Sequence, residues 1–92
     1  MDVAARFGQN LRRCRRRAGL SQEELGLRSS LHRTEIGLLE RGARVPRIDT
    51  LVKISSALQI RPSELIEGIE WMPGNTTSGS FAIAAEGDPR SN

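Results

Sequence analysis

Two helix starts stand eleven residues apart in this sequence, one at Ser21 and one at His32. Ser21 is a preferred N-cap residue, and Glu24 follows it at the spacing of a capping box. The separation leaves room only for a short helix over 22–29 and a tight turn before the next helix, which should end at Gly42. Apolar residues at the spacing of a hydrophobic staple flank both starts: Leu20 with Leu25, and Leu31 with Ile36.

Three further helices are predicted from apolar residues that recur at helical spacing. The first runs from about Val3 to Ala18, another begins near Ile48 and ends near Gln59, and a short one begins at Pro62. The stripes that define them are Phe7, Leu11, Cys14 and Ala18; Ile48, Leu51, Ile54 and Leu58; and Leu65, Ile66 and Ile69. Aromatic residues make up only 3% of the chain, so the core must consist of aliphatic side chains, which suits packed helices.

The pattern changes after Gly68. Ile69 and Trp71, then Phe81 and Ile83, alternate with polar or small residues, which fits two short strands of a hairpin. A disordered tail is the alternative, because the intervening stretch is rich in Gly, Asn, Thr and Ser. We expect a helical domain over 1–68, a C-terminal extension over 69–85 and a disordered tail over 86–92.

Basic residues are concentrated in the first half of the chain. Residues 1–48 hold eleven Arg against five acidic residues, a net charge of +6, whereas residues 49–92 hold three basic and six acidic residues, a net charge of −3. A basic surface attracts a polyanion, and the planar guanidinium of Arg suits phosphates and guanine edges. A GC-rich genome, which favours Arg codons, is the alternative explanation of the composition.

Several classes of protein are excluded by the sequence. No run approaches the roughly 18 apolar residues of a membrane span, and no apolar signal stretch opens the chain, so we expect a cytoplasmic protein. One Cys and one His cannot supply an internal disulfide or a usual zinc site, so no metal or other cofactor is expected. Paired carboxylates and a phosphate-binding glycine loop are missing too, so we expect no enzymatic activity.

The family that this chain resembles is the Xre/Cro, lambda-repressor-like family of helix-turn-helix transcription regulators. The resemblance covers about residues 6–67 and rests on the stretch SQEELGLRSSLHRTEIGLLERGARVPRIDTLVKISSALQIRPSEL. Within it, the HRTEI segment is similar to controller proteins of restriction-modification systems. The resemblance implies an all-α, five-helix DNA-binding domain, followed here by a short C-terminal extension.

The helix after His32 is the expected reader of DNA. In a helix-turn-helix, the second helix enters the major groove by its N-terminal end. Arg33 can donate two hydrogen bonds to guanine, Thr34 can touch a base edge or a phosphate, and Leu38 can contact a thymine methyl. Glu35 can accept from cytosine N4, or it can serve as a favourable charge in the first turn of its own helix.

Phosphate contacts are expected from residues on either side of the reader helix. Gln22 stands at a helix N-terminus, where unpaired backbone amides can meet a phosphate, and the family resemblance gives it the same role. Arg41 and Arg44 follow the reader helix and are placed to flank the groove, with Arg47 a weaker candidate. Solvated surface arginines are the alternative.

The arginines of the first helix have different expected roles, because helical spacing spreads them around the helix. Arg15 lies close to the apolar stripe and, by the resemblance, forms a structural ion pair with Glu40. Cys14 should be a small buried apolar side chain, with a redox switch as the alternative. The arginines expected to be mostly solvated are Arg12, Arg13, Arg16 and Arg17.

Two residues depart from the family pattern near the turn. Ser30 stands where the family usually has Gly, so the backbone must either adopt a left-handed conformation with a side chain present or close differently. His32 replaces the usual Ser or Asp cap. Together they predict a locally weaker turn.

These features predict a sequence-specific regulator that binds double-stranded DNA at a pseudo-palindromic operator as a homodimer. Exposed Ile69, Trp71 and Phe81 are the expected dimerisation residues, because large apolar groups in an extension need a place to pack. The alternative is an antitoxin or another protein-interaction module, in which the extension covers a protein partner.

Overall fold

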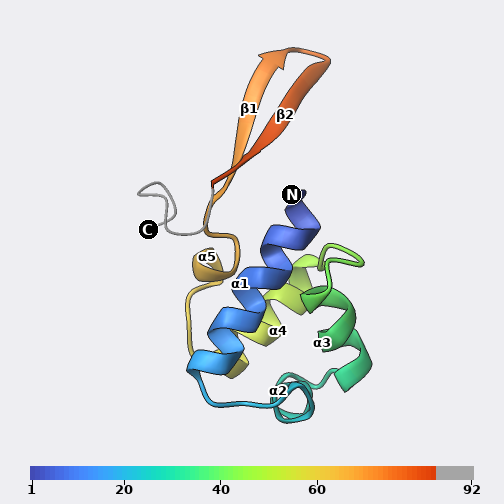
Figure 1. The fold of residues 1–92 in the computed structure, drawn as a ribbon, viewed down its shortest axis with the longest axis vertical. Helices are drawn as coiled ribbons and strands as arrows, with labels where there is room; N and C mark the ends of the chain where they lie inside the picture. Colours follow the sequence, from blue (N-terminus) through green and yellow to red (C-terminus); the bar gives the residue numbers. More distant parts are fainter. Residues whose placement is uncertain (85–92) are drawn as a thin grey trace.

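Five helices and a two-stranded hairpin follow one another in residues 1–84, the part of the chain that the computed structural model describes (Figure 1). The helices are α1 (Val3–Arg17), α2 (Gln22–Ser29), α3 (Arg33–Glu40), α4 (Ile48–Leu58) and α5 (Pro62–Leu65). The antiparallel strands are β1 (Ile69–Asn75) and β2 (Ser78–Ile83). This arrangement confirms the expected five helices and the hairpin, while the tail expected over 86–92 lies outside the described residues.

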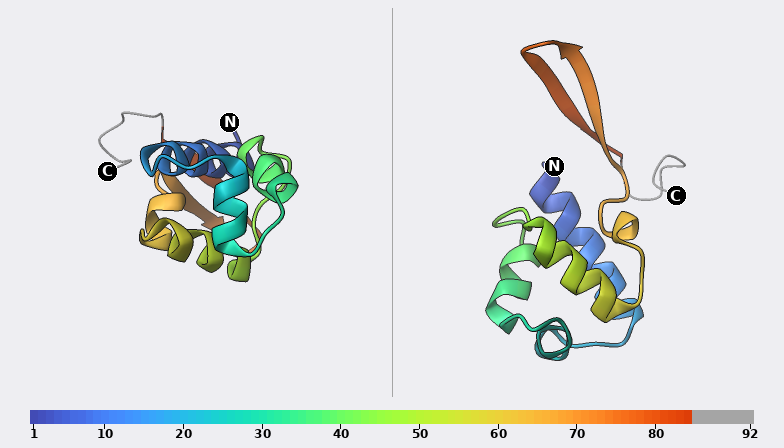
Figure 2. Two further views of the ribbon diagram at one scale, coloured as in Figure 1. Left: turned by 90° about the horizontal axis from the view of Figure 1, so that it is seen from below. Right: turned by 180° about the vertical axis from the view of Figure 1, so that it is seen from behind.

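The core lies between the helices, with α1 in contact with α3 and α5, and α2 in contact with α3 and α4 (Figure 2). Three residues of the predicted stripes are exceptions. Ala18 is exposed because it follows the end of α1. Ile48 is 77% exposed because it is the first residue of α4, and Ile66 is 46% exposed because it follows the end of α5. The buried apolar residues of the core are Phe7, Leu11, Cys14, Leu20, Leu25, Ile36, Leu39, Ile54, Leu58 and Leu65.

The ends of α1 and α3 follow from residues beside them. Asp2 caps α1, because its carboxylate accepts a hydrogen bond from the backbone N of Ala5 at 2.8 Å. Gly19 and Gly42 follow these two helices with φ of 74° and 71°, a left-handed conformation that glycine adopts at little cost. The stops predicted at these two glycines are therefore confirmed.

The strands of the hairpin run further than the sequence pattern predicts. β1 continues to Asn75 and β2 begins at Ser78, so only residues 76–77 remain for the turn. Asn75 Oδ1 accepts hydrogen bonds from the backbone N of Thr77 at 2.9 Å and from the Ser78 hydroxyl at 3.0 Å. Because these hydrogen bonds to the Asn75 side chain close the turn, the polar residues next to the turn become part of the two strands.

Two buried polar side chains of α1 hold the base of the hairpin. Arg6 donates from Nε to the carbonyl of Glu67 at 3.2 Å and from Nη1 to the carbonyl of Ala84 at 2.6 Å. Asn10 Nδ2 donates to the carbonyls of Leu65 and Glu67 at 3.0 and 2.9 Å. The hairpin is thus tied to α1 at both of its ends, and it projects at the opposite end of the long axis from α2 (Figure 1).

Candidate nucleic-acid interface

The turn between α2 and α3 is fixed by hydrogen bonds at the start of α2 and by close packing at its end. Ser21 Oγ accepts from the backbone N of Glu24 and Glu24 Oε1 accepts from the backbone N of Ser21, both at 3.0 Å, which completes the predicted capping box. Ser30 has φ 59° and ψ 38°, so the left-handed conformation is the outcome at this departure from the family pattern. A Cβ on Gly26 would lie 2.6 Å from the carbonyl oxygen of Leu31, so the turn packs directly on the α2 backbone.

The N-terminal end of α3 is capped by His32 and faces solvent. His32 Nδ1 accepts a hydrogen bond from the backbone N of Thr34 at 3.0 Å, so the imidazole performs the capping role of the usual Ser or Asp. Arg33 and Thr34, two of the predicted base-contacting residues, are exposed, whereas Leu38 is half-buried. The start of α3 is therefore the part of the helix that is open to a large partner.

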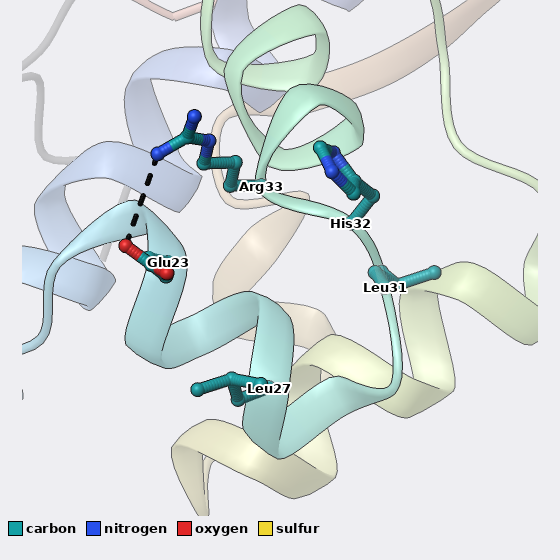
Figure 3. Close-up of a pocket in the computed structure, with 5 residues that line it drawn as sticks. All are labelled: Glu23, Leu27, Leu31, His32 and Arg33. Atoms are coloured by element: carbon teal, nitrogen blue, oxygen red, sulfur yellow. Dashed lines mark ion pairs between the residues drawn. The ribbon is translucent and has the colours of Figure 1, made fainter.

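A hollow of about 340 Å³ lies beside this exposed end. Figure 3 shows the Arg33 guanidinium turned toward Glu23 of α2, with 3.9 Å between Arg33 Nη1 and Glu23 Oε2. The two side chains are 66% and 67% exposed, so solvent screens the pair and it holds Arg33 only weakly. The residues that line the hollow are Glu23, Leu27, Leu31, His32 and Arg33.

Glu40, the last residue of α3, receives hydrogen bonds from two other helices. Arg15 of α1 binds it through both carboxylate oxygens, with Nε to Oε2 at 2.5 Å and Nη2 to Oε1 at 2.9 Å. Gln22 at the start of α2 donates from Nε2 to Oε1 at 3.2 Å, and Arg12 Nε lies 3.5 Å from the same oxygen. The Glu40 side chain is only 1% exposed, so this carboxylate fixes α1, α2 and α3 relative to one another.

The charge of Glu40 is maintained by these partners. Burial raises the pKa of its carboxyl, but the hydrogen bonds from Arg15 and Gln22 outweigh burial and leave the pKa below the ordinary value. The same hydrogen bond raises the pKa of Arg15. The pair is therefore ionised at neutral pH, although both side chains are largely removed from water.

Gln22 and Arg41, two of the predicted phosphate-contacting residues, come together beside Gly37. A Cβ on Gly37 would lie 3.1 Å from Arg41 Nη1 and 3.6 Å from Gln22 Oε1. The absence of a side chain at Gly37 therefore makes room for two polar groups of the protein itself. This places an amide and a guanidinium from different elements on one side of α3.

Arg44, the third predicted phosphate-contacting residue, lies in the loop between α3 and α4. Its Nη1 is 3.3 Å from Glu35 Oε2, and the two side chains are 53% and 27% exposed. Glu35 stands in the first turn of α3, in agreement with one of the two roles considered from sequence, and its carboxylate also orients Arg44. Arg47 is 84% exposed and lies 3.4 Å from Asp49.

The arginines of α1 are less uniformly solvated than the sequence predicts. Arg13 Nη2 lies 3.1 Å from Glu67 Oε2, and the Arg13 side chain is only 32% exposed, so the expectation is wrong for this residue. Arg17 Nη2 lies 3.1 Å from Glu64 Oε1 but remains exposed. The acidic residues around α5 pack along α1, and this tertiary contact is invisible in the spacing of α1 itself.

The predicted dimerisation residues do not share one environment. Ile69 is half-buried and packs against the core of its own chain, so the expectation that it is exposed is wrong. The cause is that Ile69 stands at the base of the hairpin, where β1 leaves the helical part. Trp71 and Phe81 are 55% and 56% exposed, and their rings meet edge to face with 5.1 Å between centroids.

The polar residues that hold the hairpin were not found from sequence. Arg6 is 1% exposed and Asn10 is fully buried, and the Oδ1 atom of Asn10 has no hydrogen-bond partner among residues 1–84. Each precedes a core residue of α1, Phe7 or Leu11, by one position. That position flanks the apolar stripe, and it is the signal that could have identified them.

Two kinds of site are missing from the described part of the chain. Residues 1–84 hold no group of three His, Cys, Asp or Glu side chains that could bind a metal ion. None of the helices in this part is both long enough and apolar enough to cross a bilayer.

Comparison with known proteins identifies relatives of the helical part. Residues 11–65 match the family model HTH_3, which describes a helix-turn-helix. The control protein C.BamHI of Bacillus amyloliquefaciens is 42% identical over 67 residues, which are 72% of this chain and 83% of the relative.

Solved structures give the same result. The restriction-modification controller protein C.AhdI from Aeromonas hydrophila is 44% identical, with a TM-score of 0.66 over 67% of this chain and 94% of that one. The P22 c2 repressor, solved in complex with a synthetic operator, is 29% identical, with a TM-score of 0.63 and the same two coverages. The family model ends at residue 65, so the hairpin lies outside it.

Proposed function

Because the chain belongs to the HTH_3 helix-turn-helix family of DNA-binding transcription regulators, we propose that it binds a pseudo-palindromic operator as a homodimer, with α3 in the major groove. The family is a DNA-binding class and not a class of enzymes. The observation that carries the proposal is the exposed N-terminal end of α3, together with Gln22, Arg41 and Arg44 beside the same helix.

Arg33 is the residue to which we assign base recognition at a guanine. Its pair with Glu23 is long and exposed, so exchanging that pair for the O6 and N7 atoms of guanine costs little. Thr34, also exposed, is assigned to a neighbouring base edge or phosphate. Leu38 is assigned an apolar contact with a thymine methyl, and its half-buried side chain limits that contact to one edge.

Phosphate binding is assigned to Gln22, Arg41 and Arg44. The amide of Gln22 stands at the start of α2, where the free backbone N–H groups and the helix dipole favour an anion. Arg41 lies beside it at Gly37, so one phosphate can accept from both residues. Arg44 is half-exposed and reaches the groove from the loop after α3.

The division of labour along the chain follows from this proposal. We assign DNA binding to residues 1–68 and dimerisation to the extension over 69–85, with the two half-sites about one turn of DNA apart. We also assign it to the cytoplasm, because its proposed partner is DNA. The relatives above are named control proteins and a repressor, so they give no support to the alternative of an antitoxin with a protein partner.

The test is selection of bound duplexes from a random DNA pool, followed by affinity measurements on the selected site. We expect an inverted repeat, relaxed preference at one position per half-site for Arg33→Ala, and uniformly weaker binding for Arg44→Ala. Lys53→Ala on the exposed side of α4 removes the same unit charge and should change neither property. Failure to enrich any motif, or equal effects of all three substitutions, would refute base recognition by α3.

A further inference from the structure

The hairpin is an unusual element in the described part of the chain, because it makes few contacts beyond its base. A lone two-stranded hairpin is marginally stable in water, and it leaves the backbone groups on both outer edges unpaired. The HTH_3 match ends before it begins. An explanation of the hairpin must therefore come from its own residues.

The hydrogen-bond register determines which backbone groups face outward. The backbone N of Ala84 donates to the carbonyl of Gly68 at 2.8 Å, so these two residues form a hydrogen-bonded pair just below the strands. Pairs alternate along an antiparallel ladder, so the Trp71–Phe81 pair is of the non-hydrogen-bonded kind. The outward N–H and C=O groups therefore belong to residues 69, 71 and 73 on β1, and to residues 79, 81 and 83 on β2.

The two edges differ in their capacity to pair with another strand. Pro73 occupies one of the outward positions of β1 and has no N–H to donate, and the same strand carries the charged Glu70. β2 has the sequence SGSFAI, without proline or charge. Proline and charge are the usual protections of a free edge, so β1 carries such protection and β2 does not. Toward its base, β2 contacts α1, and Phe81 and Ile83 line a hollow with residues 1–4 and Val45.

One face of the hairpin is also apolar. Trp71 and Phe81 stand opposite each other on the same face, and Ile69 and Ile83 form the next pair toward the base. The two rings remain more than half exposed after packing on each other. Two identical strands that pair antiparallel are related by a two-fold axis normal to the sheet, so both copies present this face on the same side.

We propose that β2 pairs antiparallel with β2 of a second copy of this chain, making a four-stranded sheet with one continuous apolar face. The absence of charge on β2 lets two copies meet without repulsion, and an antiparallel edge is complementary to itself. The pairing lies far from α2, so it leaves the start of α3 free (Figure 1). It rests on the proposed function only in taking the partner to be a second copy.

Spin-label distances test this arrangement for any register of the two strands. Met72 and Ser80 are opposite each other on the face of the hairpin away from Trp71 and Phe81, so the single-cysteine variants Met72→Cys and Ser80→Cys form a matched pair. Both are made in a Cys14→Ala background, and thermal unfolding checks that each variant is folded. In the proposed dimer, the Ser80 labels are separated laterally by one strand spacing and the Met72 labels by three. The Ser80 distance should therefore be the shorter one in any register, by roughly 10 Å where the two Ser80 residues are directly opposite each other.

A second comparison isolates the outward N–H of β2. Phe81→Ala and Phe81→Pro remove the same ring, but only proline also removes the N–H. We expect the dimer dissociation constant of Phe81→Pro to exceed that of Phe81→Ala at least tenfold, measured by sedimentation, with unchanged helical circular dichroism. Equal dissociation constants would overturn edge pairing.

The outcomes separate this proposal from the proposed function. Wild-type chain that is monomeric at tens of micromolar, or a shorter distance for the Met72 labels, overturns pairing through β2. A dimer with the expected label distances that selects no DNA sequence overturns the function and supports the pairing. Binding to an inverted repeat, together with a shorter distance for the Met72 labels, supports the function and overturns the pairing.

Discussion

Glu40 is the residue on which most of the helical arrangement depends, because Arg15 and Gln22 reach it from two other helices. Removal of one partner from a buried ion pair leaves the other charge without compensation. We predict that Arg15→Ala lowers the free energy of unfolding by about 3–5 kcal/mol, as measured by urea denaturation. Arg16→Ala, on the exposed side of the same helix, should change it by less than about 0.5 kcal/mol, and similar losses for both would contradict the assignment.

Acid should weaken the fold through the same carboxylate. The folded-state pKa of Glu40 is lowered from 4.5, so its charged form stabilises the folded chain above that pH, and the contribution is lost as pH falls through the lowered pKa. Glu24 acts in the same direction, because hydrogen bonds from Ser21 lower its pKa as well. We predict that the melting temperature falls as pH drops below about 4.5.

The control for this pH dependence is Glu40→Gln, which keeps the shape of the side chain but does not titrate. Its melting temperature should be lower than that of wild type at pH 7 and should fall less steeply with acid. A parallel pair of curves would assign the acid sensitivity to other groups.

The sequence alone could identify some of these residues and not others. The Arg15–Glu40 contact is expected from the family resemblance, and cap residues such as Ser21 can be predicted from the spacing of nearby residues. Arg6 and Arg13 were not recognised, because their partners are more than fifty residues away and two of those partners are backbone carbonyls. Every residue has a backbone carbonyl, so the sequence does not indicate which one accepts a hydrogen bond.

Among the elements, the α2–α3 turn stores strain that a substitution can release. Ser30 has a left-handed backbone, which costs a residue with a Cβ roughly 1 kcal/mol. We predict that Ser30→Gly raises the free energy of unfolding by about 0.5–1 kcal/mol. Ser56→Gly in the exposed face of α4 should lower it by a similar amount, since glycine is unfavourable inside a helix.

The hairpin depends on α1 more than on its own strands. Arg6 donates to Glu67 before β1 and to Ala84 after β2, and hydrogen bonds from a charged group contribute about 1.5–3 kcal/mol each. We predict that Arg6→Ala destabilises the chain by roughly 2–4 kcal/mol and speeds hydrogen exchange in residues 69–83. Gln9→Ala, at an exposed neighbouring position, should change neither the stability nor the exchange rate. Slow exchange in the Arg6→Ala variant would mean that the hairpin is stable without its contacts to α1.

Helix positions were predictable because their signals are local: caps, glycine stops and apolar stripes lie within a few residues of each end. The hairpin was harder to distinguish from a tail, since its turn is closed by the Asn75 side chain and its base by α1. The same is true of Ile69: the sequence pattern identifies it as an apolar strand residue, but it does not indicate that the side chain packs against the core of its own chain.

At the scale of the whole molecule, the proposed DNA binding has an electrostatic signature. Each phosphate neutralised changes the slope of log affinity against log salt by about −0.9. We predict a steep slope for wild type, and a slope smaller by about 1 per half-site contact for Arg41→Ala, measured by fluorescence anisotropy. Lys53→Ala should keep the wild-type slope. An affinity of the wild type that does not depend on salt would contradict the proposed phosphate contacts.

α1 holds the hairpin through Arg6 in its first turn and Asn10 at its middle, and it holds α3 through Arg15 near its last residue. Its 15 residues form a rod of roughly 22 Å, so the hairpin proposed to join two copies and the helix proposed to read bases are held by the same helix. A lengthened or shortened hairpin would shift the distance between operator halves without changing the bases recognised. A change confined to the chain beyond residue 65 would thus keep the recognised bases and alter the spacing between half-sites.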